Sequence, residues 1–308
     1  MINVLFAGRP ALFDVYEAPL NSAFAEAGLD VDLSRDHGPE VVDYVVLEPG
    51  GPVTDFAPFS RAKAVLSLWA GVETLVGNQT LTQPLTRMVD PGLTEGMVEW
   101  VTGYVLQYHL EIGGVLARQN GDWDRVIPPL ARHRSVGVLG LGALGFAVAE
   151  ALRALNFDVA GWSRRNKNAD FTTFAGDDGL HDILACSEIL VLLLPKTPAT
   201  ENTLNARTLS LLPKGARLIN PGRGALIDDA ALVAALDAGH IAHATLDVFR
   251  QEPLPKDHPY WAHPNVTVSP HVASETRPDT ASMVIAKNVQ RAQEGEPLLH
   301  LVDRTAGY

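Results

Sequence analysis

Three residues in the last third of the chain have side chains that could carry out acid–base chemistry on a small anion. Arg223 lies in INPGRG, Glu252 in DVFRQEP and His271 in SPHVAS, and each follows a short apolar run that predicts a strand. A guanidinium can bind a carboxylate through two parallel hydrogen bonds. An imidazole beside a carboxylate can hold and transfer a proton near neutral pH. These residues could therefore bind an organic acid and exchange a proton with it.

A glycine-rich segment upstream, GLGALG from Gly140 to Gly145, could bind a second reactant. It follows the apolar run SVGVL and precedes a helical pattern, which is the context of a dinucleotide-binding loop. Gly140 allows a tight turn, Gly142 lets the backbone approach a pyrophosphate, and Gly145 lets the helix pack on the sheet. The first amides of the helix would bind the pyrophosphate. With a nicotinamide cofactor in place, the three residues fit hydride transfer to the carbonyl of a 2-oxo acid.

The end of the next predicted strand bears on the choice of cofactor. An NAD site needs an acidic residue there, about 20 residues beyond the glycine loop, to bind the ribose hydroxyls. This strand ends in GWSRR, so Ser163 takes the place of the acid, and Arg164 and Arg165 follow it. A hydroxyl and two guanidiniums can bind a 2′-phosphate, which a carboxylate would repel. We therefore expect NADP(H) to be preferred over NAD(H); the alternative is that both arginines are solvated surface charges.

The elements that must position these residues are strands that alternate with helical patterns. Near-continuous apolar strands separated by helices indicate a parallel sheet covered on both faces. Helical spacing extends over 142–155 and 228–238. Six such strands match the doubly wound Rossmann fold, in which ligands bind at the carboxyl ends of the strands. The expected strands are 136–139, 159–162, 189–194, 216–220, 243–247 and 266–269.

The N-terminal part alternates in the same way and predicts a second, smaller α/β domain of flavodoxin-like type. Long helices expected over 94–118, with Thr94 as a possible N-cap, and over 276–294 would cross between the domains. We expect a substrate domain of residues 1–95 plus 284–308 and a dinucleotide-binding domain of residues 96–283. Both would be doubly wound parallel sheets, with the active site in the cleft. The strands expected in the first domain are 2–6, 31–33, 44–47, 64–68 and 86–89.

The charge, cysteine count and motifs of the chain argue against several kinds of partner and cofactor. The chain has 308 residues and a net charge of −12, which argues against nucleic acid and anionic membranes. Its single cysteine, Cys186, excludes an internal disulfide and lies in an apolar stretch, so a buried thiol is expected. No metal-ligand spacing is present, and we expect no metal. The sequence contains no recognisable signal peptide or membrane span, so we expect a cytoplasmic protein.

In these motifs the chain resembles the D-2-hydroxyacid dehydrogenase family. The matching segments are GLGALG, LPKTPATENT, INPGRGALIDDAAL, ATLDVFRQEPLP and SPHVAS, and together they cover most of residues 95–290. The closing residues GEPLLHLVDRTAGY and the segment SETRPDT resemble the glyoxylate/hydroxypyruvate reductase A branch in particular. The first ninety or so residues resemble that branch more loosely, chiefly through SLWAGVETLV.

The resemblance implies roles that agree with the chemistry of the side chains. Arg223 would bind the substrate carboxylate through its fork and polarise the carbonyl. His271 would be the general acid in reduction and the base in oxidation. Glu252 would bind the other ring nitrogen and favour the imidazolium form.

Further contacts are implied by the resemblance alone. Ala70 and Gly71 match a loop whose backbone amides hold the substrate carboxylate. Trp69 stands where the branch usually has a small residue, so it is either a pocket wall or a packing residue. Met97 would touch the nicotinamide, although a methionine on a helix stripe is more often a core residue. The other implied cofactor contacts are Ala143, Leu144, Leu194, Pro195, Thr200, Pro221, Gly222, Asp247, His271, Ala273 and Ser274.

The function expected from these observations is NADPH-dependent reduction of a small 2-oxo acid, glyoxylate or hydroxypyruvate, to the 2-hydroxy acid. A homodimer is implied by the resemblance. Two alternatives stay open at the level of sequence. One is a dehydrogenase acting on another D-2-hydroxy acid. The other is a cofactor-sensing regulatory protein that uses the same fold without turnover.

Overall fold

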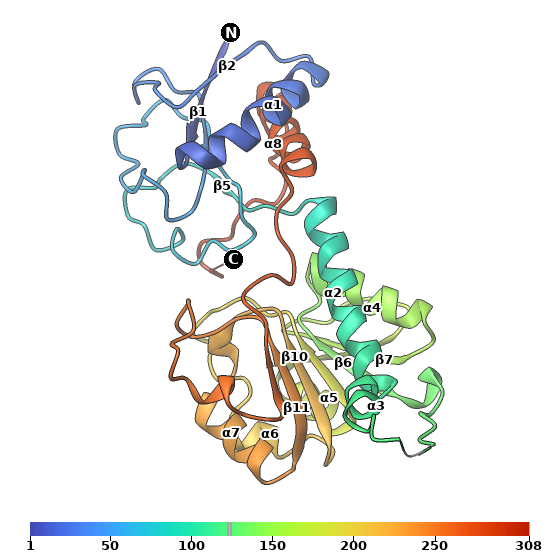
Figure 1. Ribbon diagram of the computed structural model, residues 1–308. Helices are drawn as coiled ribbons and strands as arrows, with labels where there is room; N and C mark the ends of the chain where they lie inside the picture. Colours follow the sequence, from blue (N-terminus) through green and yellow to red (C-terminus); the bar gives the residue numbers. More distant parts are fainter. Residues whose placement is uncertain (122, 124, 308) are drawn as a thin grey trace. The chain divides into compact units, whose positions relative to one another are not determined.

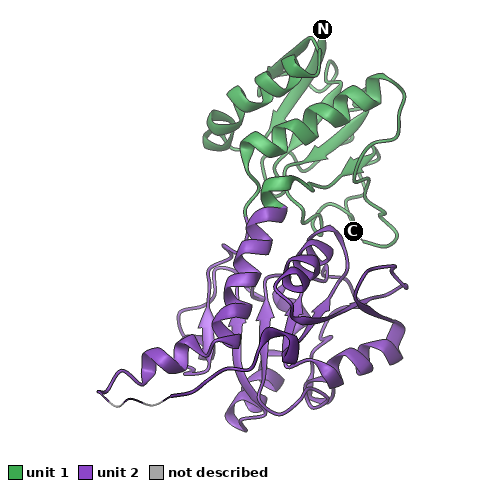
Figure 2. Cartoon of the chain, turned by 90° about the vertical axis from the view of Figure 1, so that its right-hand side faces the viewer, with its two compact units in different colours: residues 1–93, 275–308 green, residues 94–274 purple. Residues whose placement is uncertain are grey.

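The computed structural model describes residues 1–121, 123 and 125–307. The chain forms two compact units, one of Met1–Leu93 with Glu275–Tyr308 and the other of Thr94–Ser274 (Figure 2). The division expected from the sequence places the second boundary after residue 283, inside helix α8 (Pro278–Gln293). That helix packs along α1 (Pro10–Glu26) and shares its hydrophobic core, so all of α8 lies in the first unit.

The first unit contains a five-stranded parallel sheet in the order β2-β1-β3-β4-β5, which is the flavodoxin-like order. Helices α1 and α8 share one core cluster with side chains of the sheet such as Phe6, Tyr44 and Leu66 (Figure 1). A separate cluster holds Phe56, Phe59 and Leu81, which come from irregular segments. The strands are β1 (Ile2–Ala7), β2 (Val31–Ser34), β3 (Tyr44–Leu47), β4 (Ala64–Ser67) and β5 (Leu85–Thr86).

The second unit contains a seven-stranded parallel sheet in the order β12-β11-β10-β9-β6-β7-β8. Counted from β6, this is the doubly wound order expected of a Rossmann fold, extended by one strand. The strands are β6 (Ser135–Leu139), β7 (Asp158–Ser163), β8 (Thr172–Ala175), β9 (Ile189–Leu192), β10 (Ala216–Asn220), β11 (Ile241–Leu246) and β12 (Val266–Val268). The expected count of six strands was wrong because β8 is a short edge strand with no fully buried residue.

Helices cover both faces of this sheet (Figure 1). One core cluster joins α2 (Pro91–His109) and α4 (Ala143–Ala154) to β6, β7 and β9. The other joins α5 (Gly176–Cys186), α6 (Ala206–Leu209) and α7 (Asp229–Asp237) to the opposite face. Three short 3-10 turns complete the regular structure of the described residues: η1 (Ala131–His133), η2 (Gly224–Leu226) and η3 (Pro259–Trp261).

Three local predictions were wrong. The single helix expected over 94–118 is two helices, α2 and α3 (Ile112–Ala117), because Glu111 has φ 55 and turns the chain between them. Thr94 lies inside α2: the helix begins at Pro91, and the Asp90 carboxylate accepts a hydrogen bond from the Leu93 amide at 3.1 Å. Cys186 is exposed rather than buried, because it is the last residue of α5. No described helix is long and apolar enough to cross a membrane.

Candidate active site

The glycine loop is built as a phosphate site. Gly140 follows β6 with φ 107, and its amide donates to the carbonyl of Trp162 at 2.8 Å. A Cβ on Gly145 would lie 1.8 Å from the carbonyl oxygen of Gly140, so only glycine lets α4 start this close to the strand. Gly142 is the N-cap of α4, and a Cβ there would meet nothing within 4 Å. No described side chain caps this helix, so its first amides, including those of Ala143 and Leu144, fit the pyrophosphate of a dinucleotide.

The segment expected to determine the preference for NADP(H) over NAD(H) lies at the end of β7. Strands β6 and β7 are paired in register, with Leu139 opposite Trp162, so Ser163 emerges beside the glycine loop. Its hydroxyl donates to the carbonyl of Arg165 at 2.6 Å, which leaves the oxygen able to accept but occupies its proton. Arg164 and Arg165 are both exposed. The roles of these three residues toward a 2′-phosphate stay predictions.

Arg223, Glu252 and His271 are brought to one edge of the sheet by three adjacent strands. Asn220 at the end of β10 pairs with Leu246 at the end of β11, and Leu246 pairs with Val268 at the end of β12. Because the strands are parallel, the loops that follow them leave from the same edge. The glycine loop leaves from that edge too, since β6 belongs to the same parallel sheet. The second unit therefore collects the cation, the carboxylate, the imidazole and the glycine loop at one edge.

His271 and Glu252 form a close pair. The Nδ1 atom of the imidazole lies 2.7 Å from Oε2 of the carboxylate, and Oε1 accepts the amide of Phe249 at 2.8 Å. The side chains are 53% and 34% exposed, so the ring can exchange protons with solvent or a bound molecule. With Nδ1 held by the carboxylate, Nε2 is the atom left to protonate a substrate.

The loop that carries His271 is anchored by a residue whose importance the sequence indicated only through the resemblance. Asp247 is fully buried, and its carboxylate accepts the Ser269 hydroxyl at 2.6 Å. It also accepts the backbone amides of Val272 and Ala273, each at 2.9 Å. The His271 amide donates to the Asp247 carbonyl at 2.8 Å. These bonds hold His271 at φ 57, a left-handed conformation that few non-glycine residues adopt.

Arg223 lies on a loop stabilised by a second buried polar residue. Asn220 is fully buried; its amide nitrogen donates to the Arg223 carbonyl at 3.0 Å, and its amide oxygen accepts from Gly222 at 3.1 Å. The Arg223 side chain is half-buried, and its Nη1 donates to the Gly222 carbonyl at 2.7 Å. Both Asn220 and Asp247 are polar residues at the ends of apolar strands, and that position is the signal by which the sequence could have revealed them.

The other residues implied as cofactor contacts lie at the same edge, in the loops after the strands. Thr200 closes the loop after β9, because its hydroxyl donates to the Pro195 carbonyl at 2.7 Å. Leu194, Pro221, Gly222 and Ala273 are buried, and Pro195 and Ser274 are half-buried. Met97 is 6% exposed and belongs to the same core cluster as Ala273, so it is a core residue of the second unit. Contact of these residues with the nicotinamide cofactor stays a prediction.

The loop expected to bind the substrate carboxylate lies in the first unit, directly after β4. The Ser67 hydroxyl bonds both the amide and the carbonyl of Trp69, and Met88 donates to the Trp69 carbonyl at 3.0 Å. These bonds fix the backbone just before Ala70 and Gly71, which are both half-buried. The Trp69 side chain is 42% exposed, so it is not a core residue of this unit. Its role as a pocket wall stays a prediction.

Comparison with known proteins identifies the family. The sequence model of the D-isomer specific 2-hydroxyacid dehydrogenase NAD binding domain matches residues 112–273. A glyoxylate/hydroxypyruvate reductase A of Salmonella newport is 36% identical over 266 residues, covering 83% of this chain and 85% of that protein. The protein of the same name from Yersinia enterocolitica is 38% identical over 255 residues, covering 80% and 82%. These matches confirm the predicted resemblance to that branch.

Solved structures similar to this chain support the same family assignment. A D-isomer specific 2-hydroxyacid dehydrogenase from Xanthobacter autotrophicus, in complex with NADPH and MES, has a TM-score of 0.92 and 42% identity, covering 100% of this chain and 99% of that one. An NADPH-dependent glyoxylate/hydroxypyruvate reductase from Sinorhizobium meliloti, in complex with NADP and sulfate, has a TM-score of 0.86 and 33% identity, with the same coverage. By fold and by sequence, this chain belongs to the D-isomer specific 2-hydroxyacid dehydrogenase family.

Proposed function

We propose that this dehydrogenase reduces glyoxylate and hydroxypyruvate with NADPH, giving the corresponding 2-hydroxy acids. The observation that carries the proposal is the His271–Glu252 pair, with 2.7 Å between ring nitrogen and carboxylate, at the sheet edge that also bears Arg223 and the glycine loop. An acid, an anion anchor and a dinucleotide loop at one edge are the parts that reduction of a 2-oxo acid needs.

Each part has a separate task in the reaction. Arg223 binds the substrate carboxylate through its planar fork and polarises the carbonyl. The bound cofactor supplies a hydride. His271 in its imidazolium form gives its Nε2 proton to the carbonyl oxygen as the alcohol forms, and the Glu252 carboxylate stabilises that charged ring beforehand. In the reverse direction neutral His271 accepts the proton.

NADP(H) is proposed as the preferred cofactor because of the end of β7. Ser163, Arg164 and Arg165 place a hydroxyl and two exposed cations where an NAD site would need an acid. The relatives crystallised with NADPH or NADP support the same choice. The phosphates would be held by the first amides of α4, and the nicotinamide end by residues of the loops after β9, β10 and β12.

We propose further that the protein is a homodimer. In the second unit, α3 projects from the body of the unit (Figure 2). Large apolar side chains are exposed on α3 and on described residues after it, including Leu116 at 67%, Trp123 at 92% and Ile127 at 76%. An exposed run of this kind fits a contact with a second copy of the chain. Sedimentation of the wild type and of Leu116→Ser with Ile127→Ser tests this: the wild type should be a dimer and the variant a monomer, and a monomeric wild type would contradict it.

The expected cytoplasmic location stays a prediction.

The function itself is tested by mixing the purified protein with NADPH and glyoxylate and following cofactor oxidation and glycolate formation together. Turnover that saturates with glyoxylate supports the proposal. Tight NADPH binding without turnover of glyoxylate, hydroxypyruvate or a larger 2-oxo acid would instead indicate a cofactor-sensing protein. Turnover of larger 2-oxo acids alone would show that the enzyme is a dehydrogenase for another D-2-hydroxy acid.

A further inference from the structure

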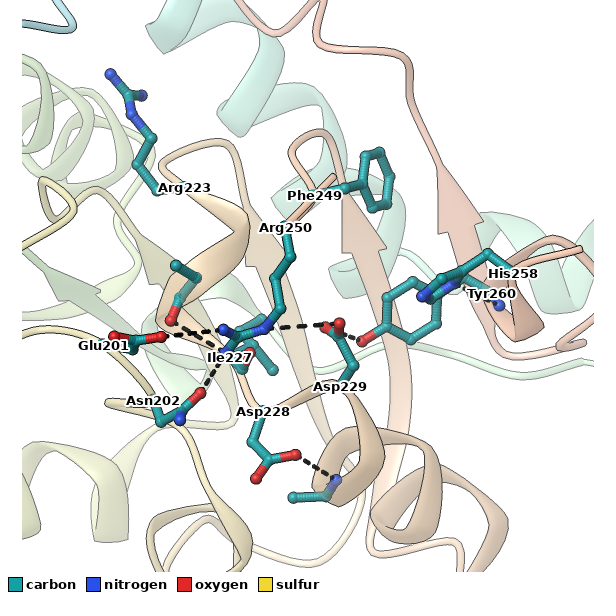
Figure 3. Close-up of polar contacts among 12 residues, drawn as sticks. Glu201, Asn202, Arg223, Ile227, Asp228, Asp229, Phe249, Arg250, His258 and Tyr260 are labelled. Atoms are coloured by element: carbon teal, nitrogen blue, oxygen red, sulfur yellow. Dashed lines mark hydrogen bonds and ion pairs between the residues drawn. The ribbon is translucent and has the colours of Figure 1, made fainter. Parts of the chain in front are cut away.

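Arg250, which belongs to none of the parts described above, lies at the centre of a polar network behind the Arg223 loop (Figure 3). Its Nη2 atom donates to the carbonyl of Ile227 at 2.6 Å and to that of Ala225 at 3.3 Å. The same nitrogen donates to the side-chain oxygen of Asn202, and Nη1 donates to Glu201 at 3.3 Å. One guanidinium therefore ties the segment after β10 to the segment after β9.

The network extends to the start of α7. The Nε atom of Arg250 lies 3.6 Å from Oδ2 of Asp229, and the other oxygen of that carboxylate accepts the hydroxyl of Tyr260 at 2.9 Å. Burial of Tyr260 and the nearby Asp229 raise the pKa of its phenol, so the hydroxyl stays a donor. Asp229 is thus fixed from both sides, and it holds the guanidinium in place.

Arg250 also stands between the two loops that carry the proposed chemistry. Its backbone neighbour Phe249 donates its amide to Glu252 at 2.8 Å. The backbones of the two loops touch: a Cβ on Gly224 would lie 2.1 Å from the carbonyl carbon of Phe249 and 2.5 Å from the Arg250 nitrogen. The chain thus packs the residue after Arg223 directly against the strand end that leads to Glu252, and the Arg250 side chain then bonds the carbonyls that follow.

We propose that Arg250 is a positioning residue for the reduction, acting through Arg223. It sets the loop that carries the substrate anchor against the loop that carries Glu252. The Arg223 side chain itself points away from the network, so Arg250 holds the backbone of this loop and leaves the side chain directed elsewhere (Figure 3). A displaced anchor binds the 2-oxo acid in a less productive position, and small displacements lower rates strongly.

An arginine is needed for this task because of its donor geometry. The planar fork offers five N–H groups, and here Nη1, Nη2 and Nε face three different segments. A lysine has one ammonium group and cannot span them. Arg250→Lys should therefore recover only part of the function, although its charge is the same.

The first test compares Arg250→Met and Arg250→Lys with the wild type, and rests on the proposed function. We expect kcat/KM for glyoxylate to fall about tenfold or more in Arg250→Met and less in Arg250→Lys. KM for NADPH and the pH profile should stay close to wild type, because the His271–Glu252 pair keeps its contacts. Arg153→Met is the matched control: it removes an arginine of the same unit that pairs with Glu150 at 2.9 Å on α4, and it should leave kcat/KM unchanged.

The second test asks whether Arg250 acts through Arg223. In an Arg223→Ala background, with single turnovers followed by NADPH fluorescence, adding Arg250→Met should change the rate less than twofold. An equal fold-loss in both backgrounds would overturn the proposal, because it would mean that Arg250 acts independently of Arg223. If Arg250→Met does not fold, Arg250→Lys takes its place in the same cycle.

The two proposals fail in different ways. If the wild type does not reduce glyoxylate or another 2-oxo acid with NADPH, the proposed function fails. If the wild type is active and Arg250→Met retains kcat/KM within twofold, only the role of Arg250 fails.

Discussion

His271 Nδ1 and Glu252 Oε2 are 2.7 Å apart, and the opposite oxygen of that carboxylate is bound by the Phe249 amide at 2.8 Å. The carboxylate is held at both oxygens, so it cannot rotate away from the ring. Asp247 holds the other side of the arrangement, because its carboxylate accepts the two amides that follow His271. The ring is therefore positioned before any substrate arrives, which is what a general acid requires.

Replacing Glu252 should slow the reduction by releasing the acid from its position. The carboxylate holds Nδ1 of His271 at 2.7 Å, which directs Nε2 outward. Glu252→Gln has nearly the same shape but lacks the charged acceptor, so it should lower kcat/KM for glyoxylate about tenfold or more, with KM for NADPH close to wild type. The measurement is kcat/KM for glyoxylate in the two proteins, and an unchanged value in the variant would remove Glu252 from this role.

Removal of the Arg223 side chain should weaken reduction far more than binding of the cofactor. Arg223→Ala should lower kcat/KM for glyoxylate by about two to three orders of magnitude, because water cannot replace a forked contact made in the transition state. Arg223→Lys should recover part of the loss. Near-normal turnover in Arg223→Ala would mean that the substrate anchor lies elsewhere.

Cofactor preference should follow the residues at the end of β7. NADPH should have the higher kcat/KM, because charge-assisted contacts to the 2′-phosphate are worth about 1.5–3 kcal/mol each, or roughly tenfold and more. Ser163→Asp with Arg164→Ala should invert the preference by adding a ribose acceptor and a repulsive charge. Arg153→Ala, at an exposed arginine of α4 that pairs with Glu150, is the control and should keep the wild-type ratio. A wild-type preference for NADH would show that these arginines do not bind the phosphate.

A half-buried histidine, His243, should make the stability of the second unit sensitive to acid. Burial, with Arg217 nearby, lowers the pKa of His243, whose Nδ1 lies 2.9 Å from the Tyr108 hydroxyl. The folded chain therefore keeps this ring neutral while the unfolded chain protonates it below about pH 6.5. Its contribution is present above that pH and is lost as pH falls toward the lowered pKa of the folded state.

The measurement is the free energy of unfolding between about pH 7 and pH 5. The loss toward acid should be smaller in His243→Gln than in the wild type. His133→Gln, an exposed histidine of the same unit, controls for the substitution. Equal slopes in wild type and His243→Gln would contradict the assignment.

Much of this architecture could be predicted because short apolar runs indicate strands and glycines between them indicate turns, and both signals are local in the sequence. Strand β10 and strand β3 were predicted with their observed bounds, and the three proposed catalytic residues do follow three adjacent strands. Edge strand β8 was missed because half-exposed Thr172–Ala175 has no apolar run. The break at Glu111 was missed because a non-glycine residue in a left-handed conformation has no sequence signature.

The supporting residues of the site were harder to predict for another reason. Arg250 bonds residues 23 to 49 positions away, which only the folded chain brings together. Its sequence neighbourhood, DVFRQEP, suggests only a charged residue in a loop. Asn220 was not singled out from the sequence and Asp247 only through the resemblance, because their hydrogen-bond partners lie in loops that only the folded chain brings to them.

One measurement tests the central claim most directly: glycolate formed and NADPH oxidised on mixing the enzyme with glyoxylate, in the wild type and in His271→Gln. The account predicts equimolar glycolate and oxidised cofactor in the wild type, and a rate lower by about two to four orders of magnitude in His271→Gln, with NADPH still bound. A wild type that binds NADPH but forms no product from any 2-oxo acid, or a His271→Gln variant as fast as the wild type, would contradict it.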